Sequence, residues 1–148
     1  KGFTRDEFAA AHPGGSLGRR LLTHVRDAMR ADQDAPRIGH GVTAMEGVVE
    51  MTRGRMGMTA VLDDAGRVIG IFTDGDLRRC LEKGADPRTA RITDVMTRDP
   101  RTIGPDKLAA EAVDVMERFK VNQLLVVDAD RRLVGALNMH DLFRAKVI

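Results

Sequence analysis

The chain contains 148 residues, of which 43% are hydrophobic and 31% are charged, and it carries a formal net charge of +2. These values are typical of a globular protein that folds as one compact domain or two small ones. No run approaches the roughly 18 apolar residues of a membrane span, and no segment has the pattern of a signal peptide, so we expect no membrane partner.

Two further features of the composition limit the location and the partners. The single cysteine, Cys80, leaves no internal disulfide and fits a reducing compartment, so we expect a cytoplasmic protein. Basic residues are spread along the chain, and Trp and Tyr are absent, so neither a basic patch nor an aromatic stacking platform is available. We therefore expect no nucleic-acid partner.

The first 22 residues share no pattern with the rest of the chain. Phe3–Phe8 reads as the capped start of a helix, and the stretch after it contains His12-Pro13-Gly14-Gly15. Because the sequence begins at Lys1 without an initiator methionine, we expect it to be a piece of a longer protein.

A helix, two strands and a second helix are predicted over the middle of the chain. Thr43 stands three residues before Glu46, a capping box that predicts the start of the first helix. Two apolar runs bounded by turn residues predict the strands, and Gly84 would end the second helix. The strands and the second helix are Met58–Leu62, Val68–Phe72 and Asp76–Lys83.

The same order returns after a polar junction at residues 86–91. A helix, two strands and a closing helix are expected at Leu108–Phe119, Leu124–Asp128, Leu133–Leu137 and Asp141–Ala145.

These two parts form a tandem repeat. Val42–Arg79 aligns on Lys107–Arg144 without a gap at an offset of 65, and 12 of the 38 positions are identical. Ordinary composition would give roughly two or three identities. Val25–Met29 aligns on Ile92–Met96 at an offset of 67, because one connecting loop is longer. Tandem units usually build binding sites between or beside them.

The repeat resembles a pair of cystathionine-β-synthase (CBS) domains, a Bateman module. The motifs that carry the resemblance are Gly70–Leu77 and Gly135–Leu142, which follow the family pattern Gly-apolar-apolar-Thr-x-x-Asp-Leu. The resemblance implies an α/β fold of two tandem CBS repeats, each β-α-β-β-α, with pseudo-two-fold symmetry and strands packed back to back. We divide the chain into residues 1–22, 23–86 and 87–148.

The first 22 residues resemble the end of the sugar-isomerase (SIS) domain of bacterial D-arabinose 5-phosphate isomerases, which join a SIS domain to a CBS pair. Such enzymes convert ribulose 5-phosphate to arabinose 5-phosphate for Kdo and lipopolysaccharide synthesis. The resemblance implies a catalytic acid/base role for His12 in the full-length enzyme. By this resemblance the chain holds only the end of a catalytic domain, so we expect it to be a regulatory part that is not itself catalytic.

Asp76 and Asp141 are the main candidates for ligand contacts. By resemblance each carboxylate accepts hydrogen bonds from the hydroxyls of a ribose, while Thr73 and Asn138 contact a phosphate or sugar oxygen beside a helix N-terminus. The alternative is that both aspartates only cap their helices. Asn138 departs from the family's Thr, which makes the two halves unequal and favours the Thr73–Asp76 pair.

Other candidates surround these pairs. Met58 and Thr59 lie on a strand expected to line the same cleft, where Thr59 faces either ligand or solvent. Arg79 and His140 could meet a carboxylate, although a lone His at a helix start is also an ordinary surface residue. The four His and Cys80 show no ligand spacing, so we expect no metal and no resident cofactor.

Three functions follow as alternatives. The module senses CMP-Kdo or CMP as a feedback effector; it senses an adenine nucleotide, AMP or ATP; or it binds nothing and holds an oligomer together. In each case we expect two copies to associate through apolar helix surface.

Overall fold

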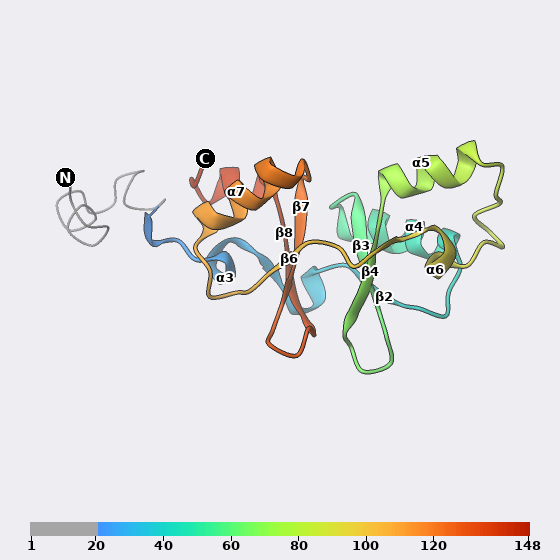
Figure 1. The fold of residues 1–148 in the computed structure, drawn as a ribbon, viewed down its shortest axis with the longest axis horizontal. Helices are drawn as coiled ribbons and strands as arrows, with labels where there is room; N and C mark the ends of the chain where they lie inside the picture. The colour runs from blue at the N-terminus through green and yellow to red at the C-terminus, as the bar shows by residue number, and fades with distance from the viewer. Residues whose placement is uncertain (1–20) are drawn as a thin grey trace.

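The computed structural model describes residues 21–148, which form two four-stranded sheets with helices on their outer sides (Figure 1). The helix start near Thr4 and the candidate catalytic residue His12 lie outside the described residues. No helix in the described part of the chain has the length and apolar character needed to cross a bilayer.

The first sheet has the strand order β2-β3-β4-β5. β3 pairs with β2 in parallel and with β4 in an antiparallel hairpin. Its strands are β2 (Arg37–Gly39), β3 (Met58–Leu62), β4 (Val68–Thr73) and β5 (Thr97–Arg98), and its helices are α4 (Ala44–Gly54), α5 (Asp74–Glu82) and α6 (Ile92–Val95).

The second sheet has the order β1-β8-β7-β6 and repeats the same pairing pattern. Its strands are β1 (Arg30–Ala31), β6 (Thr102–Ile103), β7 (Gln123–Val127) and β8 (Leu133–Asn138), and its helices are α3 (Val25–Ala28), α7 (Ala109–Phe119) and α8 (Met139–Arg144).

The segment that precedes each repeat, which we call its lead-in, joins the sheet of the other repeat. β1 precedes the first repeat but pairs with β8, and β5 precedes the second repeat but pairs with β4. The short helices follow their strands, since α3 contacts α7 and α6 contacts α4. The two structural units therefore interlock through their exchanged lead-ins.

The two sheets pack back to back, as the sequence predicts. A central cluster joins Met58 and Ile71 of the first sheet to Leu125 and Ala136 of the second. Separate clusters fill the space between each sheet and its own helices, around Phe72 in one unit and Leu137 in the other. Both hairpins are thus covered on two faces, which explains their continuous apolar sequences.

Most element boundaries agree with the sequence analysis. β3 matches its expected range, Thr43 accepts a hydrogen bond from the Glu46 N–H in the expected capping box, and Gly84 follows α5 with φ +79°. The first lead-in also contains an extra 3₁₀ turn, Asp32–Asp34, which accounts for the change of offset from 67 to 65.

The helices after β4 and β8 begin two residues earlier than expected. α5 starts at Asp74 and α8 at Met139, because Thr73 and Asn138 are the N-cap residues. Asp76 and Asp141 therefore occupy the third helical position, where a carboxylate can bond back to the N-cap backbone.

Two glycines admit the exchanged lead-ins, and we expect them to differ in their tolerance of alanine. A Cβ on Gly135 would lie 2.8 Å from the backbone oxygen of Arg30, whereas a Cβ on Gly70 would meet only the flexible side chain of Met96. Gly135→Ala should lower the free energy of unfolding by about 2–3 kcal/mol and Gly70→Ala by about 1 kcal/mol. Urea denaturation measures both, with Gly39→Ala, which has open space, as the control. An equal loss in Gly70→Ala and Gly135→Ala would contradict this account.

Candidate functional site

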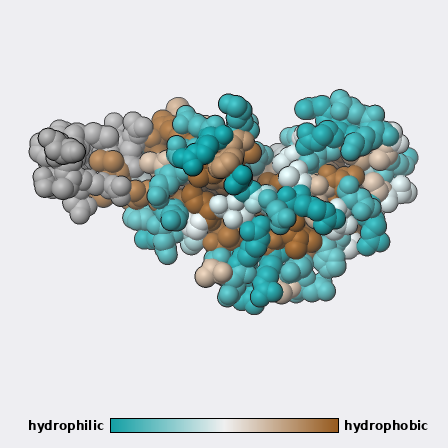
Figure 2. Space-filling view, viewed as in Figure 1, coloured by the Kyte–Doolittle hydropathy of each residue, from teal (hydrophilic) through white to brown (hydrophobic). Residues whose placement is uncertain are grey.

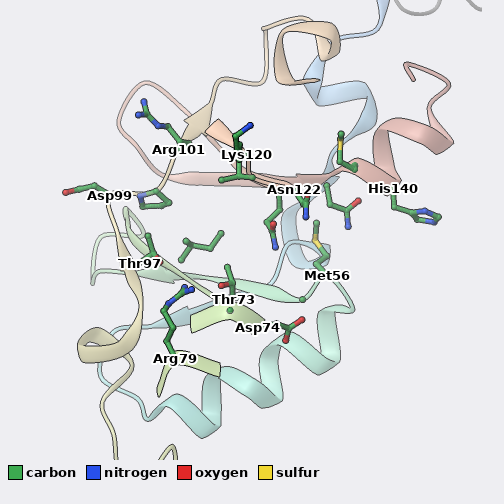
Figure 3. Close-up of a pocket in the computed structure, with 18 residues that line it drawn as sticks. Met56, Thr73, Asp74, Arg79, Thr97, Asp99, Arg101, Lys120, Asn122 and His140 are labelled. Atoms are coloured by element: carbon green, nitrogen blue, oxygen red, sulfur yellow. The ribbon is translucent and has the colours of Figure 1, made fainter. Parts of the chain in front are cut away.

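A cavity of about 920 Å³ lies where β4 and β8 end and α5 and α8 begin (Figure 3). Both repeats line it, with Thr73 and Arg79 on one wall and Asn138 and His140 on the other. In the space-filling view the surface is hollowed between the helices of the two repeats, and hydrophobic side chains show in the middle of the molecule (Figure 2). The fold thus brings the two repeated motifs to one site.

Thr73 and Asp76 form a closed hydrogen-bond pair at the start of α5. Thr73 donates to Asp76 Oδ2 from its backbone N–H, at 2.9 Å, and from its hydroxyl, at 3.0 Å. In return the hydroxyl oxygen accepts from the Asp76 N–H at 3.2 Å. This pair fixes the Thr73 side chain at the cavity wall.

The other oxygen of Asp76 is also bonded within the protein. Oδ1 accepts from the Thr97 hydroxyl at 2.8 Å and from Arg79 Nη2 at 2.7 Å. Asp76 is only 3% exposed, while the Arg79 side chain is 60% exposed. The carboxylate therefore lies just behind the cavity wall, and Thr73, Thr97 and Arg79 stand between it and the open space.

The second repeat builds the same pair with different residues. Asn138 Oδ1 accepts from the Asp141 N–H at 2.8 Å, and the Asn138 N–H donates to Asp141 Oδ2 at 3.0 Å. Asn138 thus preserves the capping box, so its departure from the family's Thr does not break the pair in the second repeat. Asn is as good an N-cap residue as Thr, because its side-chain oxygen reaches the same N–H groups.

The two aspartates accept hydrogen bonds from different residues of the exchanged lead-ins. Asp141 Oδ1 accepts from Arg30 Nε at 3.2 Å and also from Arg144. At Asp76 the corresponding lead-in residue is the neutral Thr97. We call Thr73, Asp76, Arg79 and Thr97 the first half-site, and Asn138, Asp141, Arg144 and Arg30 the second half-site.

Several cations lie around the cavity. Arg79 points into it from the first repeat, while Arg101, Lys120 and His140 lie at its rim (Figure 3). The Arg101 guanidinium also stacks over the Phe119 ring at 3.5 Å. Asp74 and Asp99 are the acidic lining residues, and Asp76 already pairs with Arg79. Hydroxyl, amide and cationic donors of this kind suit a polar, anionic ligand.

Four of the eight candidate binding residues line the cavity, namely Thr73, Arg79, Asn138 and His140. Asp76 and Asp141 lie behind its wall, in the capping role that the sequence left as the alternative.

Met58 and Thr59 do not line the cavity, because both faces of β3 are covered. Met58 belongs to the central cluster, and Thr59, also fully buried, donates its hydroxyl to the backbone oxygen of Ala60.

Sequence reasoning named four of the 18 residues that line the cavity and missed the other 14. Thr97, Asp99 and Arg101 come from the exchanged lead-in, and Lys120 and Asn122 follow the end of α7. These residues lie outside the strand-end motif that directed attention to residues 70–77 and 135–142. The one available signal was that Thr97 and Arg30 occupy matching positions after Met96 and Met29.

Comparison with known proteins agrees with this geometry. The model of the CBS domain matches residues 25–83 and 92–148. The arabinose 5-phosphate isomerase KdsD of Pseudomonas aeruginosa is 52% identical over the whole chain, and that of Escherichia coli K12 is 43% identical. The chain spans 45% of the length of each of these relatives.

A solved structure shares the fold. A CBS domain protein from Pyrobaculum aerophilum, complexed with AMP, has a TM-score of 0.72 at 18% identity, over 80% of this chain and 89% of that one. Two matched CBS units, exchanged lead-ins and a cavity between the repeats together show that this chain belongs to the CBS-domain family, as a tandem pair.

Proposed function

We propose that this chain is the regulatory nucleotide-binding module of an arabinose 5-phosphate isomerase and that the effector binds in the first half-site. The observation that carries the proposal is the cavity itself, which is lined by both repeats and reaches Thr73, Arg79 and Thr97 around one buried carboxylate. An arabinose 5-phosphate isomerase is 52% identical to this chain over its whole length, which supports that activity for the parent protein. The AMP bound by the Pyrobaculum protein supports a nucleotide.

When the effector binds, its groups replace hydrogen bonds that the side chains in front of Asp76 make in the free protein. Arg79 is mostly exposed, so it can leave Asp76 Oδ1 and turn toward a phosphate without unburying itself. Ribose hydroxyls then donate to the Asp76 oxygen that Arg79 and Thr97 share in the free protein. Thr73 and the first N–H groups of α5 face the phosphate.

The rim cations favour an effector with a second anionic group. Arg101, Lys120 and His140 lie away from Arg79, on the side of the second repeat. A nucleotide sugar acid such as CMP-Kdo has a phosphate for Arg79 and a carboxylate for this rim. Arabinose 5-phosphate opens the route that ends in CMP-Kdo, so the first committed enzyme would be controlled by its end product.

An adenine nucleotide is the second candidate, and the AMP complex of the Pyrobaculum protein is the observation that favours it. The ribose and phosphate contacts would be the same for AMP, because Asp76 and Thr73 do not touch the base. The two candidates differ in whether the rim cations contribute to binding. His12 would serve only in the parent enzyme, as an acid/base group.

Calorimetry of the 148-residue chain with CMP, CMP-Kdo, AMP and ATP tests the proposal. We expect CMP-Kdo to bind more tightly than CMP, because only CMP-Kdo supplies a carboxylate to the rim. Asp76→Asn should weaken binding by about 1.5–3 kcal/mol, the value of a hydrogen bond to a charged group, and Asp141→Asn by less.

The chain offers a matched control for this experiment. Arg79 and Arg144 are equivalent in the repeat, each bonds to its aspartate three residues earlier, and their side chains are 60% and 58% exposed. Arg79→Ala should weaken binding and Arg144→Ala should not. Equal effects of the two substitutions would show that the effector does not bind in the first half-site. Binding heat with AMP but none with CMP-Kdo would select the adenine nucleotide. No heat with any of the four nucleotides would leave a purely structural module.

We further propose that two copies associate through their helices. Val49 of α4, Leu81 of α5 and Phe143 of α8 are 64%, 55% and 66% exposed, so both repeats present apolar side chains on helix surfaces. Light scattering at micromolar concentration should give the mass of two chains, and Val49→Glu with Phe143→Glu should give the mass of one. Ile148→Glu, at the exposed C-terminus, is the control. A single-chain mass for the unaltered protein would contradict the association.

A further inference from the structure

The two half-sites have equivalent backbone positions but different side chains at them. Thr97 of β5 pairs with Ile71, Arg30 of β1 pairs with Ala136, and Ile71 and Ala136 are themselves equivalent at the 65-residue offset. Thr97 and Arg30 therefore hold the same position relative to Asp76 and Asp141. A ligand beside Asp141 would therefore meet the positions equivalent to those beside Asp76, with Arg30 in place of Thr97.

The Arg30 side chain spans the second half-site. Its Nε donates to Asp141 Oδ1 at 3.2 Å, and its Nη1 donates to the backbone oxygen of Gly54 at 3.0 Å. The side chain is 21% exposed, so most of it is packed between Asp141 and the end of α4. Thr97, by contrast, makes one hydroxyl contact with Asp76 and leaves the space beyond it open.

The surrounding chain is also closer on this side. Pro36 is the register counterpart of Arg101, and Gly54 is the counterpart of Phe119. A Cβ on Gly54 would lie 2.2 Å from Pro36 Cγ, so the lead-in lies directly against the end of α4. The corresponding residues on the other side are Arg101 and Phe119: Arg101 stacks over the Phe119 ring and lines the cavity.

Charge separates the half-sites further. Asp141 Oδ1 accepts from two arginines, Arg30 and Arg144, whereas Asp76 Oδ1 accepts from one arginine and one hydroxyl. Charge-assisted hydrogen bonds are about twice as strong as neutral ones. A ribose hydroxyl can replace the neutral Thr97 contact far more readily than it can displace Arg30, whose guanidinium would also lose the Gly54 carbonyl.

The extent of the cavity agrees with this difference. Its lining includes Arg79, Thr97, Arg101 and Lys120, and it includes none of their counterparts Arg144, Arg30, Pro36 and Arg55. From the second repeat the cavity is lined by residues 120–123 and 138–140, so Asn138 is the one member of the second half-site that it reaches.

We propose that Arg30 closes a latent second site for a nucleoside 5′-phosphate, so that the module takes one nucleotide per chain, through the first half-site. The single stoichiometry rests on the proposed function, whereas the latent site beside Asp141 does not. A threonine at position 30 would give the second half-site the same neutral lead-in contact that the first half-site has. An arginine at position 97 would close the first half-site in the same way.

The experiment exchanges the two residues and counts bound nucleotides by calorimetry, with CMP and AMP as the probes. Arg30→Thr should raise the stoichiometry from one to two, and Thr97→Arg should lower it from one to zero. The double variant should bind one nucleotide, and that binding should be sensitive to Asp141→Asn and insensitive to Asp76→Asn. Thermal melting of each variant checks that it folds, and Thr97→Arg tests the closing effect even if Arg30→Thr is unstable.

The outcomes separate this inference from the proposed function. If the unaltered chain binds neither probe but Arg30→Thr binds one, the latent site stands and the nucleotide-sensing function does not. If a folded Arg30→Thr variant gains no site, or Thr97→Arg binds as the unaltered chain does, Arg30 is not the closing residue. Two nucleotides bound to the unaltered chain would also overturn the inference.

Discussion

The arrangement of this molecule depends on the pairing of each lead-in strand with the sheet of the other repeat. β1 pairs with β8 and β5 with β4, over two residue pairs each. These short pairings bring Thr97 to Asp76 and Arg30 to Asp141, contacts between residues 21 and 111 positions apart in the sequence. Without the exchange, each strand-end motif would keep its capping box but would lose the residue that decides whether the space beside it is open.

Burial of the two carboxylates gives these contacts their strength. Asp76 and Asp141 are 3% and 2% exposed, and each of their oxygens accepts from a backbone, hydroxyl or guanidinium donor. A buried carboxylate without donors would be costly, so each aspartate constrains the neighbours that reach it. The same capping chemistry therefore occurs beside two different lead-ins, which bring Thr97 to Asp76 and Arg30 to Asp141.

Much of the fold follows from local patterns in the sequence. Each strand of the two hairpins lies within one residue of its expected range, because an apolar run between turn residues specifies both strands and their connection. The starts of α5 and α8 were misplaced by two residues, since Thr73 and Asn138 read equally well as strand ends or helix caps. Local signals thus determine the elements and leave their ends uncertain by one or two residues.

The site was less accessible from the sequence. Thr73 and Asn138 lie within the repeated strand-end motifs, so comparison of the two repeats finds them. Thr97 and Arg30 act across the exchange, and nothing local says which sheet a two-residue strand will join. Met58 was misjudged for a related reason: a strand covered on both faces by non-local packing has no side that opens to a ligand.

The exchanged strands also bear on how such a pair could have arisen. A single repeat would lack the strand that its partner supplies, so it would complete its sheet only by trading lead-ins with a second copy of itself. In such a symmetric dimer every lead-in would be the same, and both carboxylates would meet the same neighbour. Joining the copies in one gene frees the two positions to diverge, and the contrast between Thr97 and Arg30 is a difference that a dimer of identical single repeats would not have.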